Sequence, residues 1–305
     1  MTGPAKSTTG NGSICRVIEV HGILVTVELD GGPVRCAPRP GINPYPVVGD
    51  RVLVTTGTRP PRIDSVLERR GVLARWRRDA SRRSSGSATE HVLAANVDHA
   101  LVVVSVANPP FHPRIIDRYT VIAARGGVGV IVVLNKIDLE RPRPDLAEYR
   151  RAGLTIVEAS AATGEGLDRL VCCIEGQTVV LTGPSGVGKS SLVNALTGSR
   201  SARVGGLGGR RRQGRHTTAR SSLYDLGGGT SLIDTPGIRS LGLAGITREE
   251  LSALFPDIDE TGHRCRFRDC THDHEPGCAV RVAVRSGAIP AGRMETYLRL
   301  LHDEE

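Results

Sequence analysis

The segment that decides the fold lies at residues 178–196 and reads TVVLTGPSGVGKSSLVNAL. An apolar run ends in a G-x-x-x-x-G-K-S loop, and a helical pattern of apolar residues follows directly. In such a loop the glycines let backbone N–H groups curl around phosphates at the positive end of the helix. The sequence therefore predicts a strand–loop–helix unit that binds a nucleotide. The residues expected to contact it are Gly183, Pro184, Ser185, Gly186, Val187, Gly188, Lys189, Ser190 and Ser191.

Two motifs form the phosphate and metal side of the predicted site. Lys189 is expected to reach the β- and γ-phosphates, and the Ser190 hydroxyl to ligate Mg²⁺. Downstream, the apolar run SLI leads into DTPG at residues 234–237. Asp234 can hold the Mg²⁺ shell from the end of a strand, and the Gly237 amide can contact the γ-phosphate. DTPG alone also occurs in ordinary turns, but its place after the phosphate loop favours the metal role.

A guanine-recognition motif lies upstream, in the stretch VVLNKIDLE. The Asp138 carboxylate can accept hydrogen bonds from the N1–H and the exocyclic amine of guanine, and adenine offers no such pair. Asn135 can bond the base edge and join the motifs, while the Lys136 stem covers the base. In the later stretch EASAATGEG, Ser160 and Ala161 fit a loop whose backbone amide meets the guanine carbonyl oxygen. Together these motifs predict a site for GTP and GDP.

The order of these motifs along the chain is unusual. A Ras-like GTPase carries its phosphate loop first and its guanine motif later, whereas NKID here precedes GPSGVGKS. Joining the old termini and opening the chain elsewhere preserves the site, and domains tolerate such permutation when their termini lie close together. Residues 91–243 alternate between buried apolar strands and amphipathic helices, the pattern of a doubly wound α/β domain. We therefore expect a circularly permuted P-loop GTPase domain there.

Segments of different character flank this domain. Residues 14–74 hold about five short β-like runs between turn residues, which favours a small β-barrel of the OB type. Residues 75–90, RWRRDASRRSSGSATE, are basic and rich in serine. They are interpreted as a linker or mobile loop, with an RNA contact as the alternative. Residues 1–13 are expected to be a disordered tail. Residues 244–305 contain helical patterns, including a capping box that begins at Thr247.

The C-terminal segment also contains a cluster of metal-ligand residue types. Its members are Cys265, Cys270, His272 and Cys278. Three thiols and one imidazole form a closed tetrahedral shell, which holds a structural zinc ion and leaves no open position for catalysis. In a cytosolic protein such a cluster indicates a metal before a disulfide. His263 and His274 lie near enough to be substitute ligands, and reduced surface thiols are the alternative to a metal site.

Composition narrows the classes of partner. The chain has 305 residues and a net charge of +8, carried almost entirely by arginine. A basic surface suits a polyanion such as RNA, although a general preference for arginine would give the same total. Only three lysines occur, Lys6, Lys136 and Lys189, and two of them lie inside the nucleotide motifs. The sequence contains neither an apolar run long enough to cross a membrane nor a secretory signal, so we expect a monomeric cytoplasmic protein without a membrane partner.

These motifs identify a resemblance to a known family. The stretches LAANVDHALVVVS, NKIDL, SAATGEGLDRL, GPSGVGKSSLVNAL, GRHTT and CRFRDCTHDHEPGC resemble the ribosome small-subunit-dependent GTPase A family. That resemblance implies an N-terminal OB-fold, a central circularly permuted GTPase domain and a C-terminal helical zinc-binding domain. It also implies GTP hydrolysis with Mg²⁺, stimulated by the small ribosomal subunit and its rRNA, and a role in late maturation of that subunit.

The resemblance extends to a switch segment, GRHTT at residues 214–218. It implies that Thr217 or Thr218 contacts Mg²⁺ and the γ-phosphate, with Thr218 favoured, and that His216 orients the attacking water. Ordinary GTPases place a glutamine just after DxxG, and Ile238 stands there instead. A structural histidine is the alternative for His216. Two other functions stay open at this point, a GTP-dependent RNA-binding switch in which hydrolysis is incidental and an ATP-dependent P-loop enzyme.

Overall fold

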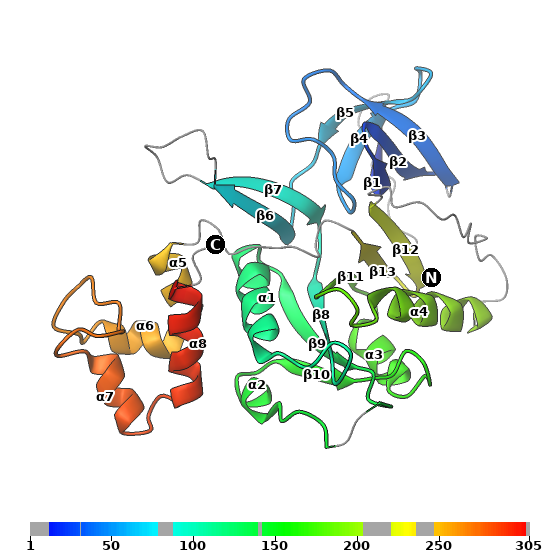
Figure 1. Ribbon diagram of the computed structural model, residues 1–305. Helices are drawn as coiled ribbons and strands as arrows, with labels where there is room; N and C mark the ends of the chain where they lie inside the picture. Colours follow the sequence, from blue (N-terminus) through cyan, green and yellow to red (C-terminus); the bar gives the residue numbers. More distant parts are fainter. Residues whose placement is uncertain are drawn as a thin grey trace.

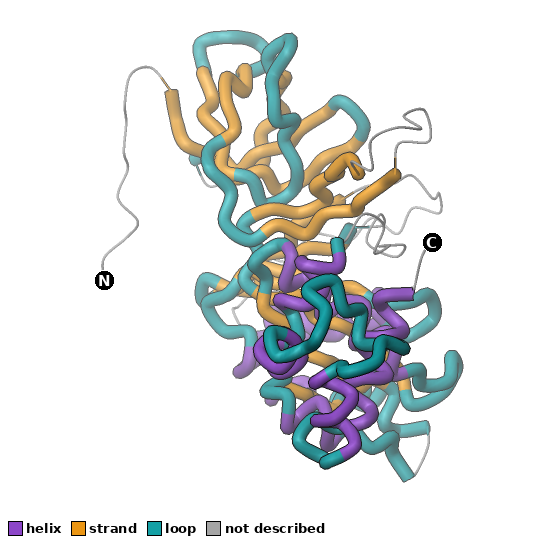
Figure 2. The backbone as a smooth tube through the Cα atoms, turned by 90° about the vertical axis from the view of Figure 1, so that its left-hand side faces the viewer, coloured by secondary structure: helices purple, strands orange, loops and turns teal. Residues whose placement is uncertain are grey.

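The computed structural model describes residues 12–30, 32–78, 88–139, 142–203, 221–235 and 247–302. An N-terminal barrel, a central α/β domain and a C-terminal group of helices follow one another along the chain (Figure 1). In the turned view of Figure 2, strands gather at the barrel end of the molecule and helices at the opposite end. This three-part architecture confirms the predicted fold class.

The barrel consists of five strands that close on themselves. β1 pairs with both β2 and β4, and β3 pairs with β5, so the order around the barrel is β1-β2-β3-β5-β4. Alternate residues point inward and form a separate core of valines with Cys15, Cys36 and Ile63. The predicted barrel is therefore present. Its strands are β1 (Gly12–His21), β2 (Leu24–Leu29), β3 (Gly32–Pro38), β4 (Arg51–Thr55) and β5 (Arg62–Val66).

A two-stranded hairpin follows the barrel, and it corrects the predicted linker. β6 (Val72–Arg78) and β7 (Ala88–Ala95) pair antiparallel, and Arg75 lies opposite His91. The ends of the expected linker, residues 75–90, are thus strands, while residues 79–87 lie outside the described part. The basic composition of these residues suggested a linker, but strands pair through hydrogen bonds between backbone groups, which do not require apolar side chains. The buried Leu73 and Ala94 anchor the base of the hairpin in the core of the central domain.

The central domain is a mixed sheet with helices on both faces. Five parallel strands stand in the order β10-β9-β8-β11-β13, and the antiparallel β12 completes the sheet. The parallel strands are apolar on both faces, and their side chains belong to three hydrophobic clusters that cover the sheet. The strands are β8 (His99–Ser105), β9 (Gly129–Asn135), β10 (Thr155–Glu158), β11 (Thr178–Thr182), β12 (Ser221–Gly227) and β13 (Thr230–Asp234). The helices are α1 (Pro113–Arg125), α2 (Ala147–Arg151), α3 (Leu167–Cys173) and α4 (Lys189–Arg203).

The barrel is attached to the central sheet by backbone and side-chain contacts. β1 pairs with the start of β12, with Val20 opposite Ser221, so the barrel continues the sheet (Figure 1). The Arg16 guanidinium donates to the Thr178 hydroxyl at 2.7 Å and to the Ser231 hydroxyl at 2.9 Å. These bonds meet the N-terminal ends of β11 and β13. The barrel therefore contacts the N-terminal ends of these strands, whereas the phosphate loop begins at the C-terminal end of β11.

The C-terminal helices pack against α1 of the central domain. Ile122 of α1 shares a hydrophobic cluster with Leu251, Phe255 and other residues of the C-terminal helices. An ion pair of 3.2 Å between Arg125 and Glu250 adds a polar contact. The predicted capping box at Thr247 is present, with both reciprocal hydrogen bonds formed. The helices are α5 (Arg248–Ala253), α6 (Pro256–Gly262), α7 (Ala279–Arg285) and α8 (Ala291–His302).

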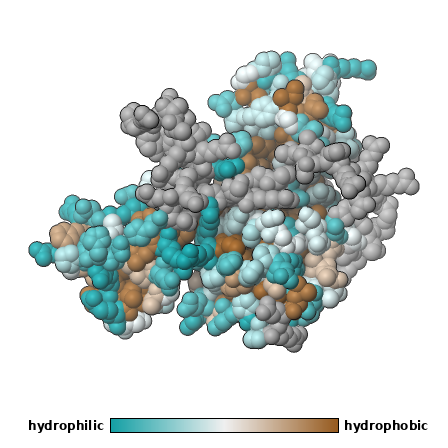
Figure 3. Space-filling model, viewed as in Figure 1, coloured by the Kyte–Doolittle hydropathy of each residue, from teal (hydrophilic) through white to brown (hydrophobic). Residues whose placement is uncertain are grey.

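The surface is mixed in character. On the face drawn in Figure 3, hydrophobic residues emerge in small patches separated by hydrophilic ones. Among the helices that the structure describes, none combines the length and the apolar character needed to cross a membrane.

Candidate nucleotide site and metal cluster

The phosphate loop has a backbone that only glycine accommodates. Gly183, the first residue after β11, has φ +128°, and a Cβ added there would lie 2.3 Å from the Val103 carbonyl oxygen. Gly186 and Gly188 also have positive φ. The Lys189 side chain is 8% exposed, and its ammonium donates to the carbonyls of Gly183, at 2.7 Å, and of Pro184. The loop thus folds around the lysine, and the positive charge lies at its centre.

Asn135 joins three motifs that are far apart in the sequence. Its side chain is 1% exposed at the end of β9. The amide Nδ2 donates to the Val187 carbonyl at 2.8 Å, and Oδ1 accepts from the Ala161 N–H at 3.1 Å. Space beside it is so tight that a Cβ at Gly188 would lie 2.3 Å from Nδ2. One buried amide therefore holds the phosphate loop, the NKID strand and the SAA loop in register.

Asp138 is held in place by the SAA loop. The Ser160 hydroxyl donates to Asp138 Oδ1 at 2.6 Å. The same hydroxyl oxygen accepts from the backbone N–H groups of Ala162 at 3.2 Å and Thr163 at 3.1 Å. Ser160 is buried, whereas Asp138 is exposed. The arrangement fixes the orientation of a surface carboxylate, as recognition of a base edge requires.

The predicted metal residues lie at the matching edge of the sheet. Asp234 ends β13, which runs parallel to β11 with Ile233 opposite Val180. Ser190 lies in the first turn of α4, directly after the loop that β11 enters. Parallel strands that end together place such residues at one edge, where α/β proteins bind their ligands. The remaining predicted residues, His216, Thr217, Thr218 and Gly237, lie outside the described part of the chain.

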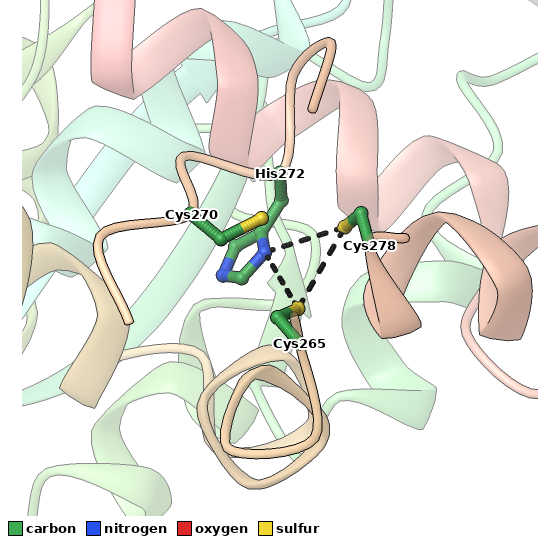
Figure 4. A group of neighbouring side chains, drawn as sticks. All are labelled: Cys265, Cys270, His272 and Cys278. Carbon is green, nitrogen blue, oxygen red and sulfur yellow. Dashed lines mark hydrogen bonds between the residues drawn. The ribbon is translucent and has the colours of Figure 1, made fainter. Parts of the chain in front are cut away.

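The metal cluster is compact (Figure 4). The ligand atoms of Cys265, Cys270, His272 and Cys278 all lie within 4.8 Å of one another. Cys265 Sγ is 3.9 Å from Cys278 Sγ, and His272 Nδ1 is 3.6 and 3.5 Å from those two sulfurs. Tetrahedral zinc with bonds of about 2.3 Å to sulfur and about 2.05 Å to nitrogen requires separations of about 3.8 and 3.5 Å. A disulfide would need about 2.05 Å, so the geometry fits a metal ion.

Electrostatics around the cluster favour ligation. Burial lowers the pKa of His272, and the neighbouring Arg248 lowers it further, so the imidazole is neutral and can bind a metal. Burial also raises the pKa of the Cys270 thiol to about 12. Burial has the same effect on Cys265, but hydrogen bonds from the backbone N–H groups of Val280 and Ala279 and with the neighbouring Cys270 and Cys278 together lower that pKa. A bound cation favours the thiolate at all three cysteines.

The two substitute ligands are not part of this group. His274 lies 3.7 Å from the carboxylate of Asp273, and its side chain is exposed. His263 follows α6 and is absent from the ligand group found among the described residues. The spacing of the cluster in the sequence therefore selected the same four residues that the fold brings together.

The sequence pattern missed one loop that touches the site. Lys136, which has φ +63°, donates from Nζ to the backbone carbonyl of Asn108 in the segment between β8 and α1. Pro109 of the same segment lies beside Gly186, with 3.3 Å between its Cδ and a Cβ built on the glycine. The sequence signal was the tripeptide Asn-Pro-Pro, separated by two residues from a buried strand, a pattern that also occurs at ordinary breaks between a strand and a helix.

Comparison with known proteins agrees with the arrangement. A sequence model of the family described as "RsgA GTPase" matches residues 66–244. The "Small ribosomal subunit biogenesis GTPase RsgA" of Chlorobaculum parvum is 40% identical over 301 residues, which cover 93% of this chain and 96% of that protein. The protein of the same name from Streptomyces coelicolor is 41% identical over 265 residues, 84% of this chain and 70% of that protein.

Solved structures show the same fold. The crystal structure of YjeQ from Thermotoga maritima superposes with a TM-score of 0.68 at 31% identity, over 95% of this chain and 97% of that one. YloQ, described as a circularly permuted GTPase, has a TM-score of 0.67 at 27% identity, over 95% of this chain and 94% of that one. Likeness over nearly the full length includes the barrel and the C-terminal helices as well as the nucleotide site. This chain belongs to the RsgA GTPase family.

Proposed function

We propose that this GTPase binds GTP and GDP at the permuted site and acts as a late biogenesis factor for the small ribosomal subunit, which stimulates its GTP hydrolysis. The observation that carries the proposal is the pair of hydrogen bonds in which Asn135 donates to the Val187 carbonyl and accepts from the Ala161 N–H. They assemble a guanine half and a phosphate half that the chain encodes in reverse order. The relatives at about 40% identity are named for biogenesis of that subunit.

Guanine selectivity is assigned to Asp138. The carboxylate is oriented by Ser160 at 2.6 Å and stands at the surface, where it can accept the N1–H and amino protons of the base. The backbone N–H of Ala161, next to Ser160, lies in the loop proposed to meet the guanine carbonyl. Adenine would present an amino group and no N1 proton, leaving the carboxylate without its pair of donors. This argues against the ATP-dependent alternative.

Phosphate and Mg²⁺ binding is assigned to the loop and to the ends of β11 and β13. The Lys189 ammonium lies inside the loop on carbonyls of Gly183 and Pro184, which supports the proposed contact of Lys189 with the β- and γ-phosphates. Ser190 and Asp234, with Thr218, would hold Mg²⁺, which neutralises charge on the phosphate oxygens. Hard oxygen ligands of this kind suit magnesium.

Hydrolysis is assigned to the switch segment. His216 would orient the attacking water, Thr217 or Thr218 would contact the γ-phosphate, and the amide of Gly237 would sense it. Ile238 has no polar group for the task. The support is the resemblance to the family motif GRHTT and the family's name as a GTPase.

The metal of the C-terminal cluster is proposed to be one zinc ion with a structural role. Three thiols and an imidazole match the ligands that zinc prefers, and four protein ligands leave no position for substrate. Backbone N–H groups of Ala279 and Arg281 donate to the sulfurs of Cys265, at 3.3 Å, and Cys278, at 3.4 Å. Such donors stabilise thiolate charge around a metal.

The partner is proposed to be rRNA of the small subunit. The net charge of +8 supplies long-range attraction to phosphates, and an OB-type barrel is a common nucleic-acid module. We expect the chain to act in the cytoplasm as a monomer, without a membrane partner.

The deciding experiment measures GTP hydrolysis by the purified chain with and without small ribosomal subunits. We expect a slow intrinsic rate that rises steeply with subunits and stays low with large subunits as the matched control. A rate that small subunits leave unchanged would refute the assembly-factor proposal. His216→Ala separates hydrolysis from binding: loss of turnover with GTP binding retained supports its catalytic role, and unchanged turnover removes it. In Asp138→Asn, preference should move from GTP to xanthosine triphosphate.

A further inference from the structure

Residues 106–112 connect β8 to α1 (Figure 1), and this segment contacts two parts of the proposed nucleotide site. On one side, Lys136 Nζ donates a hydrogen bond to the backbone carbonyl of Asn108. On the other side, Pro109 Cδ lies 3.3 Å from the position of a Cβ on Gly186, so the proline packs against the phosphate loop. The segment thus touches both the residue proposed to cover the base and the loop proposed to bind the phosphates.

A buried serine anchors this segment. Ser105 is the last residue of β8 and is 2% exposed. Its hydroxyl donates to the Pro109 carbonyl at 2.8 Å. Ser105 also stands opposite Asn135 in the β8–β9 register, and the Val106 N–H donates to the Asn135 carbonyl at 3.1 Å. The segment is therefore fastened to the strand end from which the guanine motif begins.

The contact with Lys136 depends on the backbone of Asn108. This residue has φ +49°, in the left-handed region that asparagine and glycine tolerate and β-branched residues avoid. That conformation, together with the Ser105 bond to Pro109, sets the direction of the Asn108 carbonyl. The asparagine side chain itself is exposed. The role at this position thus belongs to the backbone.

We propose that Ser105 is a positioning residue and that residues 106–110 are a further part of the guanine-nucleotide site. By holding the Lys136 ammonium at the Asn108 carbonyl, the segment fixes the lysine stem where it can cover the base. A side chain that is already ordered loses less conformational freedom on binding, and the complex dissociates more slowly. This inference rests on the proposed binding of guanine nucleotides at Lys136 and Asp138.

The test is the dissociation rate of fluorescent methylanthraniloyl-GDP from the full chain, chased with unlabelled GDP. Ser105→Ala removes one buried hydrogen bond, and we expect dissociation about fivefold faster. Ser231→Ala is the matched control. That serine is also buried and bonded, to Arg16, but it lies near the N-terminal end of β13, away from the nucleotide. We expect its rate to equal that of the wild type.

A second pair of variants tests the backbone and does not disturb the core. Asn108→Gly permits the left-handed conformation and keeps the carbonyl, so GDP should dissociate from it more slowly than from Asn108→Val. Asn108→Val disfavours that conformation and should speed dissociation severalfold. Inosine diphosphate, which lacks the 2-amino group, should respond by the same factor as GDP because Lys136 does not contact that group. If the substitution also displaced Asp138, the ratio of the GDP and inosine diphosphate dissociation rates would change, and that result would contradict the proposal.

The outcomes separate this inference from the function on which it rests. If the wild-type chain does not bind the labelled GDP, the proposed nucleotide site itself fails. If the wild type binds but Ser105→Ala and Asn108→Val both dissociate at the wild-type rate, only the positioning role is overturned. Should Ser105→Ala fail to fold, the exposed Asn108 pair decides the question alone.

Discussion

Replacing Asn135 with alanine is the sharpest perturbation of the site. The substitution removes the Nδ2–H bond to Val187 at 2.8 Å and the Oδ1 bond from Ala161 at 3.1 Å. Each bond contributes about 1 kcal/mol, and an unpaired buried backbone group costs about 1–3 kcal/mol. The side chain is 1% exposed, so water does not replace the lost bonds without rearrangement. We expect the free energy of unfolding to fall by about 2–4 kcal/mol.

The same substitution should weaken GDP binding by about tenfold. Without the Asn135 bonds the phosphate loop and the SAA loop would have to be ordered on binding, at a cost of about 1.4 kcal/mol of binding free energy. Urea denaturation gives the stability change, and titration with fluorescent GDP gives the affinity. Asn194→Ala, on the exposed face of α4, is the matched control, and its stability should change by less than about 0.5 kcal/mol. If Asn135→Ala unfolds at the same urea concentration as this control, the amide does not hold the motifs together.

Three further predictions concern the metal, the barrel and helix α1. Cys278→Ser should lower bound zinc, measured by atomic absorption, from one ion per chain towards none, and a chelator should lower the melting temperature of the wild type but not of the variant. Arg16→Ala loses bonds to Thr178 and Ser231 and should destabilise barrel docking by about 2 kcal/mol, seen as faster proteolysis between barrel and sheet; an unchanged digestion pattern would contradict it. Burial raises the pKa of Asp117 in the folded chain, so the folded state binds this proton more tightly, and the contribution of Asp117 to stability rises as pH falls towards about 3.9, the unfolded value. Asp117→Asn should remove that pH dependence from urea unfolding curves, and identical pH profiles for the two proteins would refute the assignment.

The apolar periodicity of the sequence predicted most strands and helices of the central domain, because the burial of each element in the fold matches its local sequence pattern. The strand Thr178–Thr182 is buried at every position and enters a glycine loop, so its place in a parallel sheet could be read directly. The metal cluster was equally accessible, because its four ligands lie within a short stretch of chain. NKID is too short to be informative alone, so it could be interpreted as a guanine motif only because the phosphate loop, the SAA loop and DTPG occur in the same domain.

The elements that escaped prediction depend on pairing partners far along the chain. β12, SSLYDLG, has a single fully buried residue, Leu226, and it becomes a strand because it pairs with β13 on one side and with β1 on the other. The β6–β7 hairpin escaped for the same reason, as the basic, serine-rich composition of residues 75–90 suggested a linker. The contact of Lys136 with Asn108 needed the spatial adjacency of the ends of β8 and β9. Periodicity carries no signal for any of these contacts.

The permutation gives each flanking domain a different half of the site. The barrel pairs through Val20 with Ser221, the first residue of β12, which leads through β13 to Asp234, the proposed Mg²⁺ residue. The C-terminal helices pack on α1, which follows the segment that holds Lys136 on the base side. In a GTPase with the ordinary chain order, the β8 and β12 equivalents would be internal to one continuous domain. Here β12 pairs with the barrel, and α1, which follows β8, packs against the C-terminal helices. A partner that binds both flanking domains would therefore contact the proposed phosphate half through β12 and the proposed base half through α1.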